Sequence, residues 1–137
     1  NVGVCGPQEV ALSVLTTVIG HQADKGWAIV DAGWMAMSRD RGTSRQATDY
    51  GYGAACDLAG DLVDGYVMSA ANQEHGILSR RDGVADRDIA RRFPLGTRLR
   101  ILPNHACVVA NLHDRLIGTS GGRVETVLSV AARGRVR

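Results

Sequence analysis

The segment LVDGYVMSAANQEHGILSR, residues 62–80, indicates the fold class most clearly, because it contains two apolar runs separated by a polar turn. Leu62–Ala71 has the length and the Tyr, Val and Met content of a β-strand, and the pattern resumes over Gly76–Arg80. The intervening NQEHG segment carries the residue types that form turns. We therefore expect strand, turn and strand in this segment.

The remainder of the chain shows the same pattern of short strands and few helices. A helix of about two turns is expected before Pro94, over Ala85–Arg92. The polar stretch Ser38–Asp49 is expected to form a long excursion without regular structure. A mainly β fold follows, a small barrel or sandwich of about eight strands with one or two short helices. The other expected strands are Val10–Ile19, Trp27–Val30, one resuming at Gly51, Thr97–Leu102, Pro103–Asp114, and a hairpin of 115–120 and 123–132 around Gly121–Gly122.

The composition limits the possible functions of the chain. The 137 residues are 45% hydrophobic but only 4% aromatic, so we expect one domain with an aliphatic core. A net charge of +2 from scattered basic residues argues against nucleic-acid binding. No apolar run reaches the roughly 18–20 residues of a membrane helix. Three cysteines without CxxC spacing favour a cytoplasmic protein, and a chain that starts at Asn1 is expected to be a piece of a longer one.

The segment PNHACVVANLHD, residues 103–114, carries the candidate metal ligands. On the expected strand, His105 and Cys107 point to the same side, with Cα atoms roughly 7 Å apart. An imidazole and a thiolate together favour Zn²⁺ or a similar divalent metal. His113 lies about 20 Å from Cys107 on an extended strand and is a poor third ligand. The alternative is a cysteine packed as a small hydrophobe beside a histidine with a structural role.

Four further residues are candidates for a pocket. Glu74 and His75 are adjacent, so on a strand their side chains face opposite ways, and one can line a pocket while the other supports it. The alternative is that both lie in an exposed turn with Gly76 at positive φ. Tyr52 stands between two glycines, which indicates close backbone approach to a ligand or a bulged strand. Asp31 follows an apolar strand, where capping a turn is the first interpretation.

Four motifs occur in one order along the chain: VDAGWMAMSRDRGT, GYG, NQEHG and ILPNHAC. Together they resemble the C-terminal domain of the D-serine dehydratase-like and D-threonine aldolase-like enzymes, pyridoxal-phosphate enzymes of the alanine-racemase fold type. The resemblance covers about Val10–Arg133 and implies a separate N-terminal (β/α)₈ barrel that carries the cofactor on a lysine. It implies that His105 and Cys107 are metal ligands. The cysteine, where aldolases have aspartate, indicates the dehydratase branch.

The resemblance implies a lyase that removes water from D-serine or another β-hydroxy-D-amino acid. Zinc or another divalent metal acts as a Lewis acid on the β-hydroxyl, and pyridoxal phosphate serves as the electron sink. Glu74, His75 and Tyr52 are the candidate catalytic residues, which we expect to orient the metal water or the substrate. Alternatives are aldolase cleavage of the Cα–Cβ bond and a metal-free β domain with a structural role. Lys25 is the only lysine and matches no cofactor motif, so we expect this chain alone to be inactive. The expected partners are the barrel domain, a D-amino-acid substrate and a second subunit of a homodimer.

Overall fold

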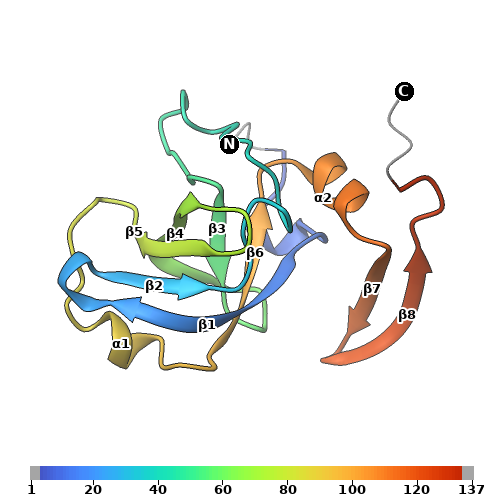
Figure 1. Ribbon diagram of the computed structural model, residues 1–137. Helices are drawn as coiled ribbons and strands as arrows, with labels where there is room; N and C mark the ends of the chain where they lie inside the picture. The colour runs from blue at the N-terminus through green and yellow to red at the C-terminus, as the bar shows by residue number, and fades with distance from the viewer. Residues whose placement is uncertain (1–3, 134–137) are drawn as a thin grey trace.

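The computed structural model describes residues 4–133, and its larger part is a closed antiparallel barrel (Figure 1). Six strands form the barrel in the order β1-β2-β5-β4-β3-β6. The excursion between β2 and β3, residues 31–52, contains no helix or strand. The barrel strands are β1 (Val14–Gln22), β2 (Trp27–Val30), β3 (Gly53–Cys56), β4 (Leu62–Ala71), β5 (Gly76–Arg80) and β6 (Arg98–Pro103).

Short helices join these strands. The single-turn helices η1 (Pro7–Glu9) and η2 (Ala23–Lys25) lie before β1 and between β1 and β2. The helix α1 (Ile89–Arg92) precedes β6, and α2 (Ala106–Leu112) follows it. None of the helices within residues 4–133 has the length and apolar character needed to cross a membrane.

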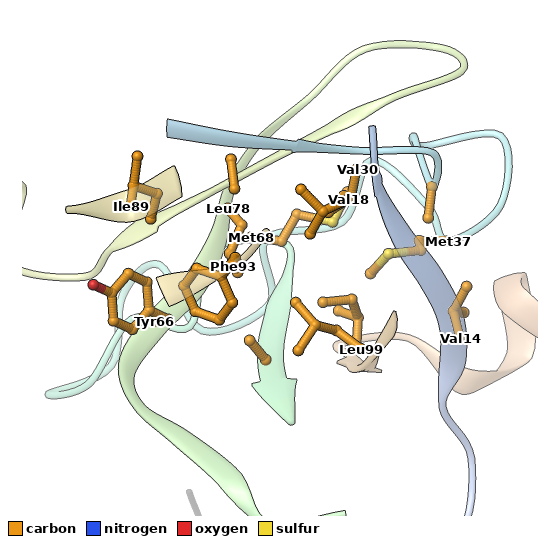
Figure 2. Close-up of a cluster of buried hydrophobic side chains, with 14 of the residues drawn as sticks. Val14, Val18, Val30, Met37, Tyr66, Met68, Leu78, Ile89, Phe93 and Leu99 are labelled. Carbon is orange, nitrogen blue, oxygen red and sulfur yellow. The ribbon is translucent and has the colours of Figure 1, made fainter. Parts of the chain in front are cut away.

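The barrel interior is packed with apolar side chains from every strand (Figure 2). Alternate residues of β1 point inward, because Val14, Thr16 and Val18 are buried. Methionine fills much of the remaining space, since Met37 and Met68 are fully buried, which the expected aliphatic core did not include.

A two-stranded sheet stands apart from the barrel (Figure 1). It consists of β7 (Arg115–Ser120) and β8 (Arg123–Ser129), and every residue of β8 is exposed. Gly121 and Gly122 both have positive φ, 54° and 76°, as the tight hairpin turn requires. The expected Gly-Gly hairpin is therefore confirmed.

Most of the expected strands are confirmed, and several boundaries move. Leu62–Ala71, Gly76–Arg80 and Trp27–Val30 are strands with the expected bounds. The strand expected from Val10 begins at Val14 and continues to Gln22, and the one expected from Gly51 begins at Gly53. The expected helix shortens to the single turn of α1, because Ala85–Asp88 lies outside it.

One expected element is wrong. Pro103–Asp114 is not a strand, because β6 ends at Pro103 and residues 106–112 form α2. A strand would place Val109 on the same side as His105 and Cys107, but Val109 is the buried residue of this helix, whereas Cys107 is exposed. A short apolar run without glycine or proline does not distinguish a strand from a helix by its periodicity.

Candidate metal site

The two candidate ligands lie where the chain leaves the barrel and enters α2. His105 is the N-cap of the helix, and Cys107 is its second residue. The His105 side chain is 41% exposed, and Cys107 is an exposed free cysteine. Both groups therefore reach solvent from a helix start, in place of the strand face expected from the sequence.

The excursion of residues 31–52 packs against both ends of α2. At the far end of the helix, His113 Nε2 donates a hydrogen bond of 2.8 Å to the carbonyl oxygen of Ala36. At the near end, the Asn104 side-chain amide donates to the carbonyl oxygen of Gly51 over 2.7 Å. Met37, between these anchor points, is buried in the core. The excursion is thus fixed to the barrel and to the helix that carries the candidate ligands.

The Asp49 side chain links residues within the outer part of the excursion, residues 41–51, to one another. Its carboxylate accepts hydrogen bonds from the Gly51 amide at 2.8 Å and from the Thr43 hydroxyl at 3.1 Å. Arg41 Nη2 lies 2.6 Å from the second carboxylate oxygen. The Gly51 amide, and to a lesser extent Thr43 and Arg41, lower the pKa of Asp49 below its usual value.

Asp40 lies directly against His105. The distance between His105 Nδ1 and Asp40 Oδ2 is 2.5 Å. No described residue forms a hydrogen bond with Nε2 of the same ring. Asp40 was not among the candidates from the sequence. Because 65 positions separate it from His105, no local spacing indicates the contact.

The donor set fits a divalent metal that keeps open coordination positions. Within residues 4–133 no cluster of three or more His, Cys, Asp or Glu side chains is placed to hold a metal. Imidazole nitrogen and thiolate sulfur are nevertheless the donors that zinc prefers, and both reach solvent here. His113 is excluded as a further ligand through Nε2, because that atom bonds to Ala36.

Glu74 and His75 lie in the turn between β4 and β5. The His75 ring nitrogen Nε2 is 3.0 Å from the Asn72 side-chain amide, and Glu74 is exposed. The structure forms no hydrogen bond between this pair and His105 or Cys107. Gly76 does not have the positive φ expected for an exposed turn, and it begins β5.

The turn between β4 and β5 packs against the start of the excursion. The Trp34 amide donates to the Asn72 carbonyl oxygen over 2.8 Å, and the Met35 amide donates to that of Gln73 over 3.2 Å. A Cβ atom at Gly33 would lie 2.2 Å from the Gln73 carbonyl oxygen. The turn and the excursion are therefore in backbone contact.

Asp31 and Tyr52 have structural contacts in this arrangement. One carboxylate oxygen of Asp31 accepts hydrogen bonds from the Thr16 hydroxyl at 2.8 Å and the Thr17 amide at 2.7 Å. Tyr52 is half-buried and packs against the core, with the Arg41 guanidinium 5.7 Å from its ring centroid. These hydrogen bonds join Asp31 to β1, so they give it a structural role across the sheet, and the turn-capping interpretation stays a prediction.

A surface cavity of about 410 Å³ lies under the outer part of the excursion. Arg41, Asp49, Arg80 and Arg81 contribute its charged groups. None of His105, Cys107, Glu74, His75 and Tyr52 lines it. The candidate residues therefore lie outside this cavity.

Comparison with known proteins identifies the family to which the chain belongs. Residues 11–119 match the family described as "Putative serine dehydratase domain", and the chain belongs to this family. It is 75% identical over 107 residues to D-threo-3-hydroxyaspartate dehydratase of Delftia sp. (strain HT23), which covers 78% of this chain and 28% of the relative. It is 34% identical over 130 residues to 3-hydroxy-D-aspartate aldolase of Paracoccus denitrificans, covering 95% and 28%.

Solved structures agree with this assignment. The Delftia dehydratase structure superposes with a TM-score of 0.89 at 64% identity, over 93% of this chain and 34% of that one. Two variants of that enzyme superpose equally well, one with a histidine replaced by alanine and one with a cysteine replaced by alanine in the metal-free form. Their substituted positions are two residues apart. This chain spans about a third or less of the relatives' length.

Proposed function

We propose that this chain is the metal-holding part of a pyridoxal-phosphate-dependent lyase that removes water from a β-hydroxy-D-amino acid. In this proposal His105 and Cys107 bind a divalent metal, for which zinc is the first candidate. The rest of the enzyme, including an N-terminal barrel that binds the cofactor, lies outside these 137 residues. The substrate class includes D-serine and 3-hydroxyaspartate.

The spacing of the two ligands carries the proposal. His105 and Cys107 are two residues apart, as are the histidine and cysteine substituted in the two dehydratase variants. The variant that lacks the cysteine is a metal-free form of that dehydratase. A fold shared at a TM-score of 0.89 supports equivalent positions for the two pairs.

The residues of this chain have distinct tasks in the proposed reaction. His105 would hold a divalent metal through Nε2 and Cys107 would hold it through its sulfur, which is fewer protein donors than zinc can accept. A divalent metal held there supplies Lewis-acid assistance to the departure of the hydroxyl. Glu74, His75 and Tyr52 are proposed to line the substrate side, where they would orient the substrate or a water molecule.

The cofactor has no candidate lysine in this chain. Lys25 Nζ lies 4.6 Å from the centroid of the Trp27 ring at the turn between β1 and β2. It is the only lysine of the sequence, and 27 positions separate it from Tyr52, the nearest of the residues proposed to bind the metal or the substrate. Pyridoxal phosphate, which supplies an electron sink when bound, is therefore proposed to be held by the barrel.

Aldolase cleavage is the second candidate function, because the Paracoccus relative is a 3-hydroxy-D-aspartate aldolase. The full-length enzyme distinguishes the two reactions by its products. A dehydratase releases a keto acid and ammonia from 3-hydroxy-D-aspartate, whereas an aldolase releases an aldehyde and glycine. Cys107 favours the dehydratase.

Metal analysis tests the proposal. The purified chain is loaded with zinc and desalted, and its metal content is measured by mass spectrometry. We expect His105→Ala and Cys107→Ala to lose the metal. Cys5→Ala is the matched control, since Cys5 is also an exposed free cysteine, and it should keep the wild-type content. Unchanged zinc in both ligand variants would overturn the proposal in favour of a metal-free structural domain.

A further inference from the structure

We infer that Asp40 is a positioning residue that fixes the tautomer and orientation of the His105 ring for metal binding. The inference rests on the proposed function, because it concerns the ligand His105. It adds a residue that lies far from the ligand pair in the sequence and that the sequence did not indicate. Three observations carry it.

The first observation is the geometry of the pair. An ionised carboxylate only accepts hydrogen bonds, so the 2.5 Å contact with Asp40 Oδ2 requires the proton to be on His105 Nδ1. The lone pair of Nε2 is then available to a metal. Histidines that bind metals in proteins generally donate their other ring N–H to a carboxylate, carbonyl or water, which also makes them stronger donors.

The second observation is that Asp40 is held in place through its backbone. The Asp40 amide donates to the Ser38 hydroxyl over 3.1 Å, and Ser38 is 7% exposed. The Asn104 side chain donates to the Asp40 carbonyl oxygen over 3.4 Å as well as to Gly51. The residue before His105 and the turn that carries Asp40 are therefore joined directly.

The third observation is that the arginines beside Asp40 bind elsewhere. Arg41 pairs with Asp49 at 2.6 Å, and the Arg39 guanidinium lies 5.4 Å from the centroid of the Trp34 ring. Neither forms an ion pair with Asp40 within the described chain. The Asp40 carboxylate is thus left to the imidazole of His105.

The tautomer of His105 gives a test that needs no metal. Nitrogen-15 chemical shifts and long-range proton–nitrogen correlations distinguish Nδ1–H from Nε2–H imidazole. We expect Nδ1–H in the wild type and a shift toward Nε2–H in Asp40→Ala. Asp40→Asn retains an oxygen acceptor and should restore much of the Nδ1–H form. Asp64→Asn, at an exposed strand position without a side-chain hydrogen bond, is the control and should match the wild type. An unchanged tautomer in Asp40→Ala overturns the inference.

Metal affinity gives the second readout, through competition with a chromophoric zinc chelator. Loss of the carboxylate should weaken binding about 10–100-fold in Asp40→Ala, with a smaller loss in Asp40→Asn and none in Asp64→Asn. If His105→Ala loses zinc while Asp40→Ala binds like the wild type, the role of Asp40 is overturned and the proposed function stands. If His105→Ala still binds zinc at wild-type strength, the proposed function itself is overturned. Far-ultraviolet circular dichroism confirms that each variant is folded.

Discussion

The side chain of Asn104 and the backbone of Gly51 are joined by a hydrogen bond of 2.7 Å across 53 positions of the sequence. The bond connects the residue before His105 with the last part of the excursion. It is one of the few direct links between the two segments that form the candidate metal site.

We predict that Asn104→Ala lowers the free energy of unfolding by about 1–2 kcal/mol, because the Gly51 carbonyl oxygen loses a partly buried donor. Zinc affinity should fall as well, since His105 follows directly. Gln46→Ala is the control: Gln46 is exposed, lies in the same excursion and has no side-chain hydrogen bond. Urea unfolding and chelator competition measure the two effects, and equal values for both variants would contradict the prediction.

The helical state of residues 106–112 is tested by two neighbouring valines. Val109 is 1% exposed, whereas Val108 is only half-buried. We expect Val109→Ala to destabilise the fold by about 2 kcal/mol, the cost typical of deleting buried methyl groups, and Val108→Ala by much less. Chemical unfolding of both variants measures the difference. The opposite order would support the strand expected from the sequence.

Tyr66 should titrate at unusually high pH. Burial, followed by its hydrogen bond to Asp86, raises the pKa of Tyr66 to about 12. Because the folded state holds this proton more tightly than the unfolded chain does, the resulting stability is complete below pH 10 and is lost between pH 10 and about 12. Absorbance at about 295 nm should show a tyrosine step near pH 12 that disappears in Tyr66→Phe and persists in Tyr50→Phe.

Gly33 tests the contact between the excursion and the β4–β5 turn. A Cβ at this position would lie 2.2 Å from the Gln73 carbonyl oxygen, which is backbone and cannot rotate away. We expect Gly33→Ala to cost about 1–3 kcal/mol of stability, as overpacking generally does. At Gly20 the nearest atoms to an added Cβ are 3.7 Å away, so Gly20→Ala should have little effect. Thermal unfolding of the two variants provides the comparison.

The sequence predicted the barrel strands because their inward side chains alternate or form short continuous runs. β4 and β5 were located with their bounds, since the NQEHG turn separates them clearly. The predicted start of β1 was too early, because Val10 and Leu12 continue its apolar pattern before the residues that pair with β2 and β6. The hydrophobic pattern could not distinguish a barrel from a sandwich. Closure of the barrel depends on the pairing of β1 with β6, which lie far apart in the chain.

The ligand pair stays a prediction, and the strand geometry from which it was first argued is wrong. His105 and Cys107 were identified from their residue types and the family resemblance, but the strand geometry used to bring them together does not exist. Asp40 was missed because its role arises from a tertiary contact between the excursion and the start of α2. Neither composition nor spacing reports such a contact.

Ring closure of the six-stranded sheet leaves β7 and β8 as the strands with an unpaired side within residues 4–133. Each presents a row of free backbone amides and carbonyls, and the solvent-exposed Ile117, Val124 and Val127 lie along them. Such a ribbon is a template for edge-to-edge self-association. We therefore expect this hairpin to promote self-association of the purified chain, and Val124→Lys to reduce it while leaving the barrel folded.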